Sequence, residues 1–521
     1  MKTLARALGF GLAGLAQAAS IAAPWNGQPL WWLQLISLAV LAWQLDALGE
    51  RTQPRPAWRS AALYGWLFST AWLCGTFWWL FVSMHTYGGL AAPLAAVAVL
   101  ALSAALSLYY AAAAAFYVAF APVHRAGAVL LFAAAWTLAE LLRNSLFTGF
   151  PWGAGGYAHV DGPLAAYAPW LGVYGVGAVA AAIAALVAVA LRAARGGKRA
   201  MALALALVLL GAPALVAAVR SAPDEAALSR GRLEVALLQG NIPQDEKFIP
   251  GGGIATALQW YGEQLQRATA PLVITPETAL PLLPTQLPPG LLDAIAARYG
   301  NSKQTAIVGL PLGDGRVYTN TVLGFGPGRS TPYRYDKHHL VPFGEFVPGL
   351  FRWFTDMMNI PLGDFQSGGL AQPPLTWEGQ RIAPNICYED LFGDEIGANF
   401  RDEAQAPTVL LNVSNIAWFG DTVAIDQHLA ISRMRALEFQ RPMVRATNTG
   451  ATAVIDHRGR VTHALPRLTR GVLVASVEGR AGLTTYAFWV SRVGLWPLWG
   501  LALAIMAAAP LFKRRRASRA A

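Results

Sequence analysis

The chain has 521 residues, more than one ordinary domain, and its composition is unusually apolar. Hydrophobic residues make up 55% of it and charged residues only 13%, whereas soluble globular domains average about 25% charged residues. These values exclude a disordered chain, a nucleic-acid partner and a single soluble enzyme, and they indicate an integral membrane protein. The net charge is +11, yet residues 220–485 hold 23 Lys and Arg against 25 Asp and Glu, a net charge of −2. The basic excess therefore lies in the apolar parts of the chain.

Eight stretches are apolar enough to predict helices that cross a membrane, which takes about 20 residues each. The first stretch can also be interpreted as a signal peptide, because Lys2 and Arg6 precede an apolar run and Ala16-Gln17-Ala18 resembles a cleavage site. The spans that follow favour an uncleaved first helix. The eight predicted spans are residues 4–23, 29–48, 60–82, 89–121, 126–142, 163–191, 200–219 and 493–512.

Positive charges predict the orientation of these spans, because Lys and Arg are enriched in cytoplasmic connections. The connections 24–28, 83–88 and 143–162 together carry only Arg143. We therefore expect both termini in the cytoplasm and residues 220–485 on the opposite side. The basic residues of the predicted cytoplasmic side are Lys2, Arg6, Arg51, Arg55, Arg59, Arg125, Arg192, Arg195, Lys198, Arg199, Lys513, Arg514, Arg515, Arg516 and Arg519.

The long insert is predicted to be an α/β domain, in which a layered sheet is covered by helices. We therefore divide the chain into a membrane domain at 1–219, a catalytic domain at 220–485, and a last span with a basic tail at 486–521. Helical patterns occupy Ile254–Arg267, Leu291–Tyr299 and Thr422–Phe439. Predicted strands are Leu233–Leu238, Leu272–Thr275, Thr305–Gly309, Thr321–Phe325, Ile382–Cys387, Val409–Val413, Val444–Thr447, Ala451–Ile455 and Val472–Val477.

Cys387 ends a predicted buried strand and is followed directly by Tyr388, Glu389 and Asp390. Ligands of open α/β sheets bind beyond the carboxyl ends of strands, so a thiol there is placed to act as a nucleophile. A lone cysteine is more often a small buried hydrophobe. Two features favour catalysis: the predicted compartment is oxidising, where a structural cysteine would be paired, and acidic and phenolic side chains follow the thiol.

Two further side chains are candidates for the same site. Glu277 ends another predicted strand and is either a general base for the thiol proton or a solvated loop carboxylate. Lys337 is either a surface lysine or a cation that stabilises an oxyanion, and it is one of only three lysines in residues 220–485, against 20 arginines. His338 and His339 offer a rival Cys–His dyad, in which at most one can serve because neighbours on a strand point opposite ways.

The order of these residues resembles the nitrilase superfamily, which works at carbon–nitrogen centres through a thioester. Its pattern is a Glu, then K-x-x-L-V-P-F-G-E from Lys337 to Glu345, then C-Y-E at Cys387. With eight predicted spans around it, the chain is similar to the apolipoprotein N-acyltransferases, the membrane-bound members of that superfamily. The resemblance covers essentially the whole chain, with motifs at Gln239–Gln244, Lys337–Pro348, Gly363–Phe365, Ile386–Asp390 and Asn412–Gly420.

This resemblance implies an αββα sandwich with Glu277 as general base, Lys337 as oxyanion lysine and Cys387 as nucleophile. It further implies that Glu345, Tyr388 and Glu389 support the triad, and that Trp418, Phe343 and Phe346 contact substrate. Two positions depart from the family pattern: Ile416 stands where N-D-x-W-F-G has Asp, and Phe248 stands where Trp is common. Neither belongs to the triad.

The resemblance also implies a ping-pong reaction in the bacterial inner membrane, with the catalytic domain in the periplasm. A phospholipid would donate an acyl chain to Cys387, and the N-terminal amine of a diacylated apolipoprotein would accept it, without a metal or an organic cofactor.

Two other functions are weighed against this one. A membrane-anchored amidase would use the same triad to transfer the acyl group to water, but eight spans exceed the needs of an anchor. A transporter with an external domain would use Glu140 and Arg143 as its polar pair. The apolar segment Phe343–Gly369 is predicted to form a mobile lid at the membrane interface, with a packed core segment as the alternative.

Overall fold

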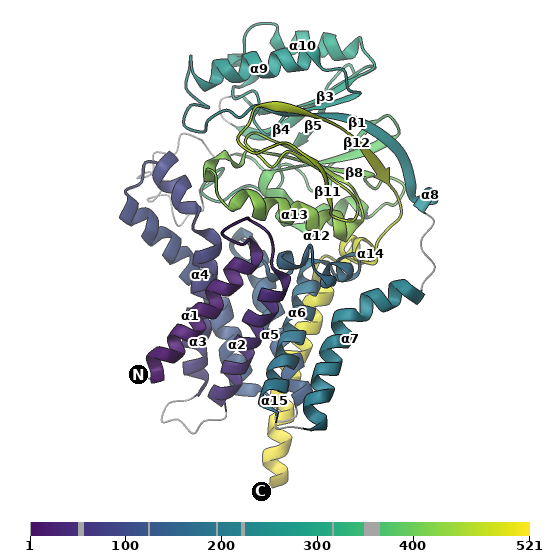
Figure 1. The fold of residues 1–521 in the computed structure, drawn as a ribbon. Coiled ribbons are helices and arrows are strands. Elements are labelled where there is room, and N and C mark those ends of the chain that lie inside the picture. The colour runs from purple at the N-terminus through teal and green to yellow at the C-terminus, as the bar shows by residue number, and fades with distance from the viewer. Residues whose placement is uncertain are drawn as a thin grey trace. The chain divides into compact units, whose positions relative to one another are not determined.

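A computed structural model of the chain describes residues 2–49, 57–122, 125–193, 196–219, 225–314, 317–347 and 365–520. The chain forms two compact units, and Figure 1 shows the helices and strands of each. The first unit comprises Met1–Phe81, Ala92–Ala222 and Leu495–Ala521. The second comprises Pro223–Gly494 together with Val82–Ala91, a short segment of the N-terminal half.

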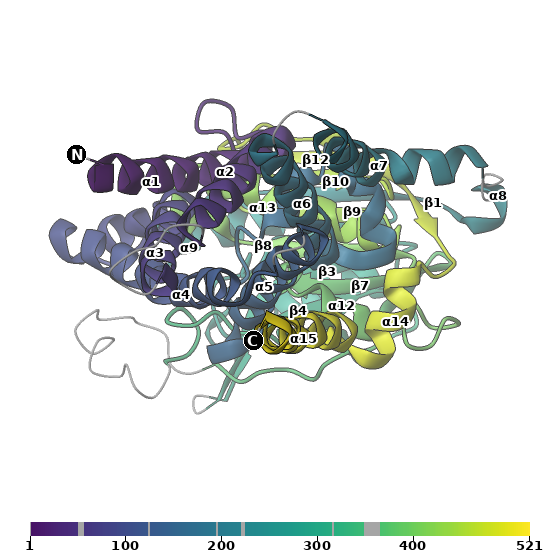
Figure 2. The same ribbon diagram turned by 90° about the horizontal axis from the view of Figure 1, so that it is seen from below.

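The first unit is a bundle of long helices. Small residues let these helices approach closely: a Cβ added to Gly14 would meet the Phe68 carbonyl oxygen at 2.1 Å, and one added to Gly65 would meet Ala114 at 2.6 Å. α5 contacts both α6 and α15, and all three are seen almost end-on in Figure 2. The helices are α1 (Lys2–Ile21), α2 (Trp31–Gly49), α3 (Ala57–Phe77), α4 (Ala92–Phe120), α5 (Arg125–Ser145), α6 (Ala168–Arg192), α7 (Gly197–Val219) and α15 (Trp496–Ala520).

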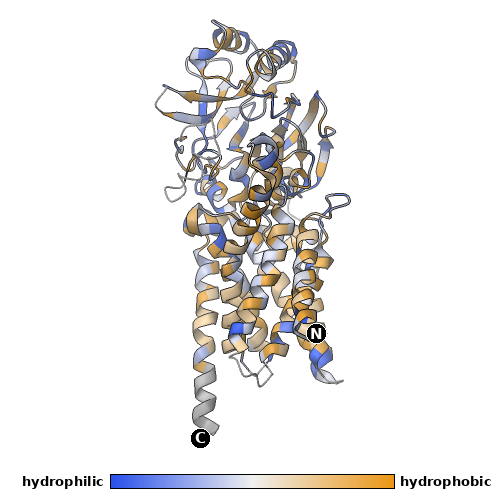
Figure 3. Ribbon diagram, turned by 90° about the vertical axis from the view of Figure 1, so that its left-hand side faces the viewer, coloured by the Kyte–Doolittle hydropathy of each residue, from blue (hydrophilic) through white to orange (hydrophobic). Residues whose placement is uncertain are grey.

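Within the described residues, six helices are long and apolar enough to cross a membrane, or seven if the bent pair Thr485–Val493 and Trp496–Leu511 counts as one span. Their apolar character is plain in Figure 3. α3 covers most of the predicted span 60–82 but lies outside that set, because its Trp, Tyr, Ser, Thr and Gly residues lower its hydropathy. The first unit thus fits a membrane domain.

Glu140 and Arg143 on α5 are buried and hold the neighbouring backbone. The Arg143 guanidinium donates to the carbonyl oxygens of Phe150 (2.8 Å) and Trp152 (2.7 Å), and a Glu140 oxygen accepts from the Gly155 amide at 2.8 Å. Both charged groups therefore fasten the chain that follows α5, which is a structural role.

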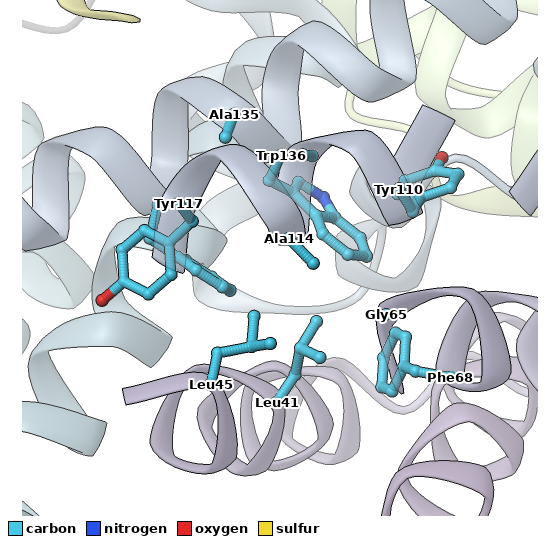
Figure 4. A pocket seen from close by; sticks show the side chains of 11 residues that line it. Leu41, Leu45, Gly65, Phe68, Tyr110, Ala114, Tyr117, Ala135 and Trp136 are labelled. Carbon is cyan, nitrogen blue, oxygen red and sulfur yellow. The ribbon is translucent and has the colours of Figure 1, made fainter. Parts of the chain in front are cut away.

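An apolar pocket lies between α2, α3, α4 and α5 of the same bundle (Figure 4). At one side the Tyr117 hydroxyl donates to Asp46 at 2.5 Å. The side chains that line the pocket include Leu41, Leu45, Phe68, Tyr110, Phe132 and Trp136.

The second unit contains two six-stranded sheets, in the orders β12-β1-β2-β3-β4-β5 and β11-β10-β9-β8-β7-β6. The predicted two-sheet fold is confirmed, and so are all nine predicted strands. The three strands that the sequence did not reveal, β5, β6 and β11, are short edge strands. The strands are β1 (Ser229–Gln239), β2 (Leu272–Ile274), β3 (Thr305–Gly313), β4 (Tyr318–Phe325), β5 (Tyr333–Asp336), β6 (Leu375–Trp377), β7 (Gln380–Ile386), β8 (Val409–Ser414), β9 (Met443–Thr447), β10 (Ala453–Ile455), β11 (Val461–Ala464) and β12 (Gly471–Arg480).

Alternating side chains of the strands separate two cores. On β1, Val235 and Leu237 face the core between the sheets, whereas Ala236 and Leu238 pack against helices. Those helices are α9 (Gly253–Arg267) and α10 (Leu291–Gly300), which cover the first sheet; α13 (Ala424–Phe439) lies on the side of the second sheet, as Figure 1 shows. The three helices match the predicted ones.

The strand directions bring several strand ends to one edge. β1, β2 and β3 are parallel, and β5 points the same way because it is antiparallel to β4, which is antiparallel to β3. In the second sheet β7, β8 and β9 are parallel. Residues that follow β2, β5, β7 and β8 can therefore meet.

Candidate active site

Cys387 is the first residue after β7 and begins the short helix η7 (Cys387–Leu391). Its φ of 54° lies in the left-handed region, which is strained for a residue with a side chain. Two neighbours hold its carbonyl oxygen: Asn412 on β8 at 3.1 Å and His428 on α13 at 3.2 Å. The turn that presents the thiol is thus fixed from two sides.

Glu277 and Lys337 lie in one buried charged cluster with Glu345. A Glu277 oxygen is 3.6 Å from the Lys337 ammonium, which is 2.9 Å from a Glu345 oxygen. Asn320 on β4 donates to both carboxylates, at 2.7 Å to Glu277 and 2.8 Å to Glu345. The second Glu277 carboxylate oxygen accepts a hydrogen bond of 2.8 Å from the backbone N–H of Asn415, which lies just after β8. The three sequence-predicted groups Glu277, Lys337 and Glu345 are therefore brought together.

The cluster acts electrostatically on the thiol. Burial, and after it the Glu277 carboxylate, raise the pKa of Cys387 to about 12, although Lys337 lowers it. Burial alone would lower the pKa of Lys337, but the Glu345 and Glu277 carboxylates raise it above its ordinary value. At neutral pH the site therefore holds a protonated Cys387 thiol and a charged Lys337 ammonium.

Glu389 fastens the segment after β5 to the end of β7. One of its oxygens accepts from the amides of His338 (2.6 Å) and His339 (3.1 Å), and the other accepts from the Ile386 amide (2.5 Å). Burial raises the pKa of Glu389 to about 6, against the effect of these amide donors. Its geometry supports a positioning role, since it links the backbone next to Lys337 to the backbone next to Cys387.

The two histidines after Lys337 point to other partners. His338 Nδ1 is 2.8 Å from the Gly368 carbonyl oxygen, and His339 Nδ1 is 2.9 Å from a Glu395 oxygen. The His339 ring also stacks on Phe392. This geometry does not favour the Cys–His dyad. The buried Tyr388 ring packs edge-on against the same Phe392.

The predicted substrate-contacting residues lie on two turns. Phe343 and Phe346 close the turn that carries Glu345, through a backbone hydrogen bond of 2.8 Å from Phe343 to Phe346. Trp418 is half-buried in η9 (Ile416–Phe419) and packs edge-on against Tyr87, 6.3 Å between ring centroids. Tyr87 belongs to the N-terminal segment that joins this unit. Of the predicted lid Phe343–Gly369, residues 348–364 lie outside the described residues.

A buried network of hydrogen bonds next to the Cys387 turn could not be predicted from the sequence. Asp390 accepts from His428 at 3.0 Å and from Arg445 at 3.2 Å, and Arg445 also contacts His428 Nδ1 at 2.9 Å and the Ser432 hydroxyl. All four side chains are fully buried. Asp390, directly after C-Y-E, was the only sequence signal, because the other three lie in strands and helices far along the chain.

Two family models match different parts of the chain. The family model "Apolipoprotein N-acyltransferase N-terminal domain" matches residues 13–186, and "Carbon-nitrogen hydrolase" matches residues 234–486. A protein of Verminephrobacter eiseniae named apolipoprotein N-acyltransferase is 59% identical over 93% of this chain and 92% of its own length. A Ralstonia nicotianae protein of the same name is 46% identical over 94% and 91%, respectively.

The chain belongs to the apolipoprotein N-acyltransferase family. This membership confirms the family resemblance and the N-acyltransferase class that the motifs predicted, and it does not favour the amidase alternative. The region matched by the carbon–nitrogen hydrolase model contains every predicted site residue of the apolipoprotein N-acyltransferase pattern, from Glu277 to Trp418.

Proposed function

We propose that the chain transfers an acyl chain from a membrane phospholipid to the N-terminal amine of the diacylglyceryl-cysteine of apolipoproteins, the last step of lipoprotein maturation. The observation that carries this proposal is the fixed, left-handed turn at Cys387 in the electrostatic reach of Glu277 and Lys337. Family membership supplies the reaction class.

In the first half-reaction, Glu277 accepts the Cys387 proton and the thiolate attacks the ester carbonyl carbon of the phospholipid. The Lys337 ammonium stabilises the oxyanion that forms. The bond to the glycerol oxygen then breaks, the leaving alkoxide takes the proton from Glu277, and a lysophospholipid departs. Because the resting thiol is protonated, proton transfer and attack must be closely coupled.

In the second half-reaction, the α-amine of the acceptor attacks the thioester carbonyl. Glu277 takes a proton from the amine, the carbon–sulfur bond breaks, and Cys387 recovers its proton. Both substrates carry acyl chains, and moving such chains into water costs about 0.8 kcal/mol per CH₂. A catalytic domain joined to membrane helices avoids that cost.

The same proposal includes the topology. We infer eight spans in the inner membrane, with both termini cytoplasmic and the catalytic domain of residues 220–485 in the periplasm. The distribution of Lys and Arg between the connections supports this orientation. Residues 1–219 then form the membrane domain, and 486–521 the last span and its tail.

Intact mass spectrometry after mixing the full chain with a diacyl phospholipid tests the thioester. We expect an adduct of one acyl chain that hydroxylamine removes and that Cys387→Ala does not form. The Cys74→Ala variant, which changes the other cysteine, is the matched control and should keep the adduct. An adduct on Cys387→Ala would contradict the assignment of the nucleophile.

A further inference from the structure

A second buried lysine lies beside the charged cluster and has no role in the mechanism above. Lys247 stands in the turn after β1, and its side chain is only 2% exposed. Its Nζ donates to the backbone carbonyl oxygen of Glu277 at 3.4 Å. The next two residues of the turn, Phe248 and Ile249, are large apolar side chains that remain 40% and 51% exposed.

Lys247 and Lys337 differ in their counter-ions. Lys337 has two carboxylates within 3.6 Å, whereas no carboxylate of the described residues lies within 4.0 Å of Lys247 Nζ. The charged or titratable groups that act on Lys247 from other elements are Glu277, after β2, and Cys387, after β7. Burial lowers the pKa of Lys247 to about 8, although these two groups raise it.

Among the described residues, the Lys247 ammonium has one long hydrogen bond for its three donors and lies 5.9 Å from the centre of the Phe248 ring. An anion that reaches this buried ammonium is therefore stabilised. The surface next to it is apolar, because Phe248 and Ile249 are exposed. A ligand that matches both features is an amphiphile whose anionic group sits beside its acyl chains.

We propose that Lys247 binds the phosphodiester of the acyl donor, with Phe248 and Ile249 forming an apolar lip for its chains. This inference rests on the proposed function, because it assigns the donor side of the same site. A phosphodiester held there would orient the neighbouring glycerol ester toward Cys387, so Lys247 would select phospholipids over neutral acylglycerols.

The test compares two donors that differ only in the phosphate headgroup: dipalmitoyl phosphatidylethanolamine and dipalmitoylglycerol. The rate of acyl-adduct formation on the full chain is measured for wild type, Lys247→Met and Lys247→Arg. Lys303→Met removes the exposed third lysine of the domain and is the matched control.

We expect Lys247→Met to lower the rate with the phospholipid at least about tenfold more than the rate with dipalmitoylglycerol, as for a lost hydrogen bond to a charged group. Lys247→Arg should preserve most of the preference, and Lys303→Met should leave both rates unchanged. Equal losses of rate with both donors would overturn the proposal, because they would show that Lys247 acts on the Cys387 thiol and not on the phosphate of the donor. An unchanged preference would also overturn it. A wild-type chain that forms no adduct with either donor would instead contradict the proposed function.

Discussion

Asn320 bridges two carboxylates, and an aspartate in its place would repel both of them. Its side-chain amide donates one N–H to Glu277 and one to Glu345, and the residue is only 5% exposed. In Asn320→Asp both donors become acceptors. Three carboxylates then compete for the single ammonium of Lys337.

The expected effect is large because Asn320, Glu277 and Lys337 are buried and the Glu345 side chain is only 11% exposed. Two unit charges 4 Å apart repel by about 4 kcal/mol at an effective dielectric constant of about 20. Each lost hydrogen bond to a charged group costs a further ~1.5–3 kcal/mol. The variant cluster relieves this repulsion by binding a proton, and a proton on Glu277 prevents it from accepting the proton of Cys387. We therefore expect adduct formation at pH 7 to fall roughly 100-fold or more, and the acidic limb of the pH profile to move at least about one unit upward.

The assay follows adduct formation by quenched intact mass spectrometry between pH 5 and 9. Asn301→Asp adds the same charge at an exposed position just after α10 and is the matched control. Asn320→Ala removes the donors without adding a charge, so its loss should be smaller. Thermal unfolding shows whether Asn320→Asp is folded. If the folded variant keeps the wild-type rate and pH profile, the cluster of Glu277, Lys337 and Glu345 does not supply the base that deprotonates Cys387.

Three further predictions follow from the site. Glu277→Gln should abolish thioester formation. It should also speed the alkylation of Cys387 by iodoacetamide at pH 8, since removing the carboxylate lowers the thiol pKa from about 12. Slower alkylation would show that the Glu277 carboxylate does not raise the thiol pKa. Lys337→Ala should lose roughly 10²–10³ in adduct rate while His338→Ala stays active, and a histidine variant as inactive as the lysine variant would favour a Cys–His dyad. Arg445→Met removes the permanent cation beside the buried Asp390 carboxylate and leaves it only the hydrogen bonds from His428 and Ser432, so it should cost up to about 3–5 kcal/mol in unfolding free energy, which a chemical-denaturation curve would show.

The sequence predicted the parts of the site that sit at strand ends. Cys387 follows an apolar strand and Glu277 another, so alternation and length sufficed to place them at a sheet edge. Lys337 follows β5, a short edge strand that the sequence did not reveal, and it was found from the motif it begins.

Other side chains around the proposed triad, such as Asn320 and Arg445, could not be predicted, because their contacts depend on register between distant strands. Asn320 reaches Glu277 only through the order β2-β3-β4, and Arg445 reaches Asp390 only because β9 lies two strands from β7. In the sequence each is one polar residue in an ordinary element. Similarly, nothing in the segment Val82–Ala91 indicates that it joins the catalytic unit.

The most direct test of acyl transfer through Cys387 follows the fate of the acyl group. The full chain is first acylated with a phospholipid, freed of excess donor, and then mixed with a synthetic diacylglyceryl-cysteine peptide. Mass spectrometry is used to follow the enzyme, the peptide and free fatty acid together. We expect the adduct on Cys387 to disappear as an amide-linked acyl chain appears on the peptide in equal amount. Loss of the adduct as free fatty acid, with the peptide amine unmodified, would contradict the proposal.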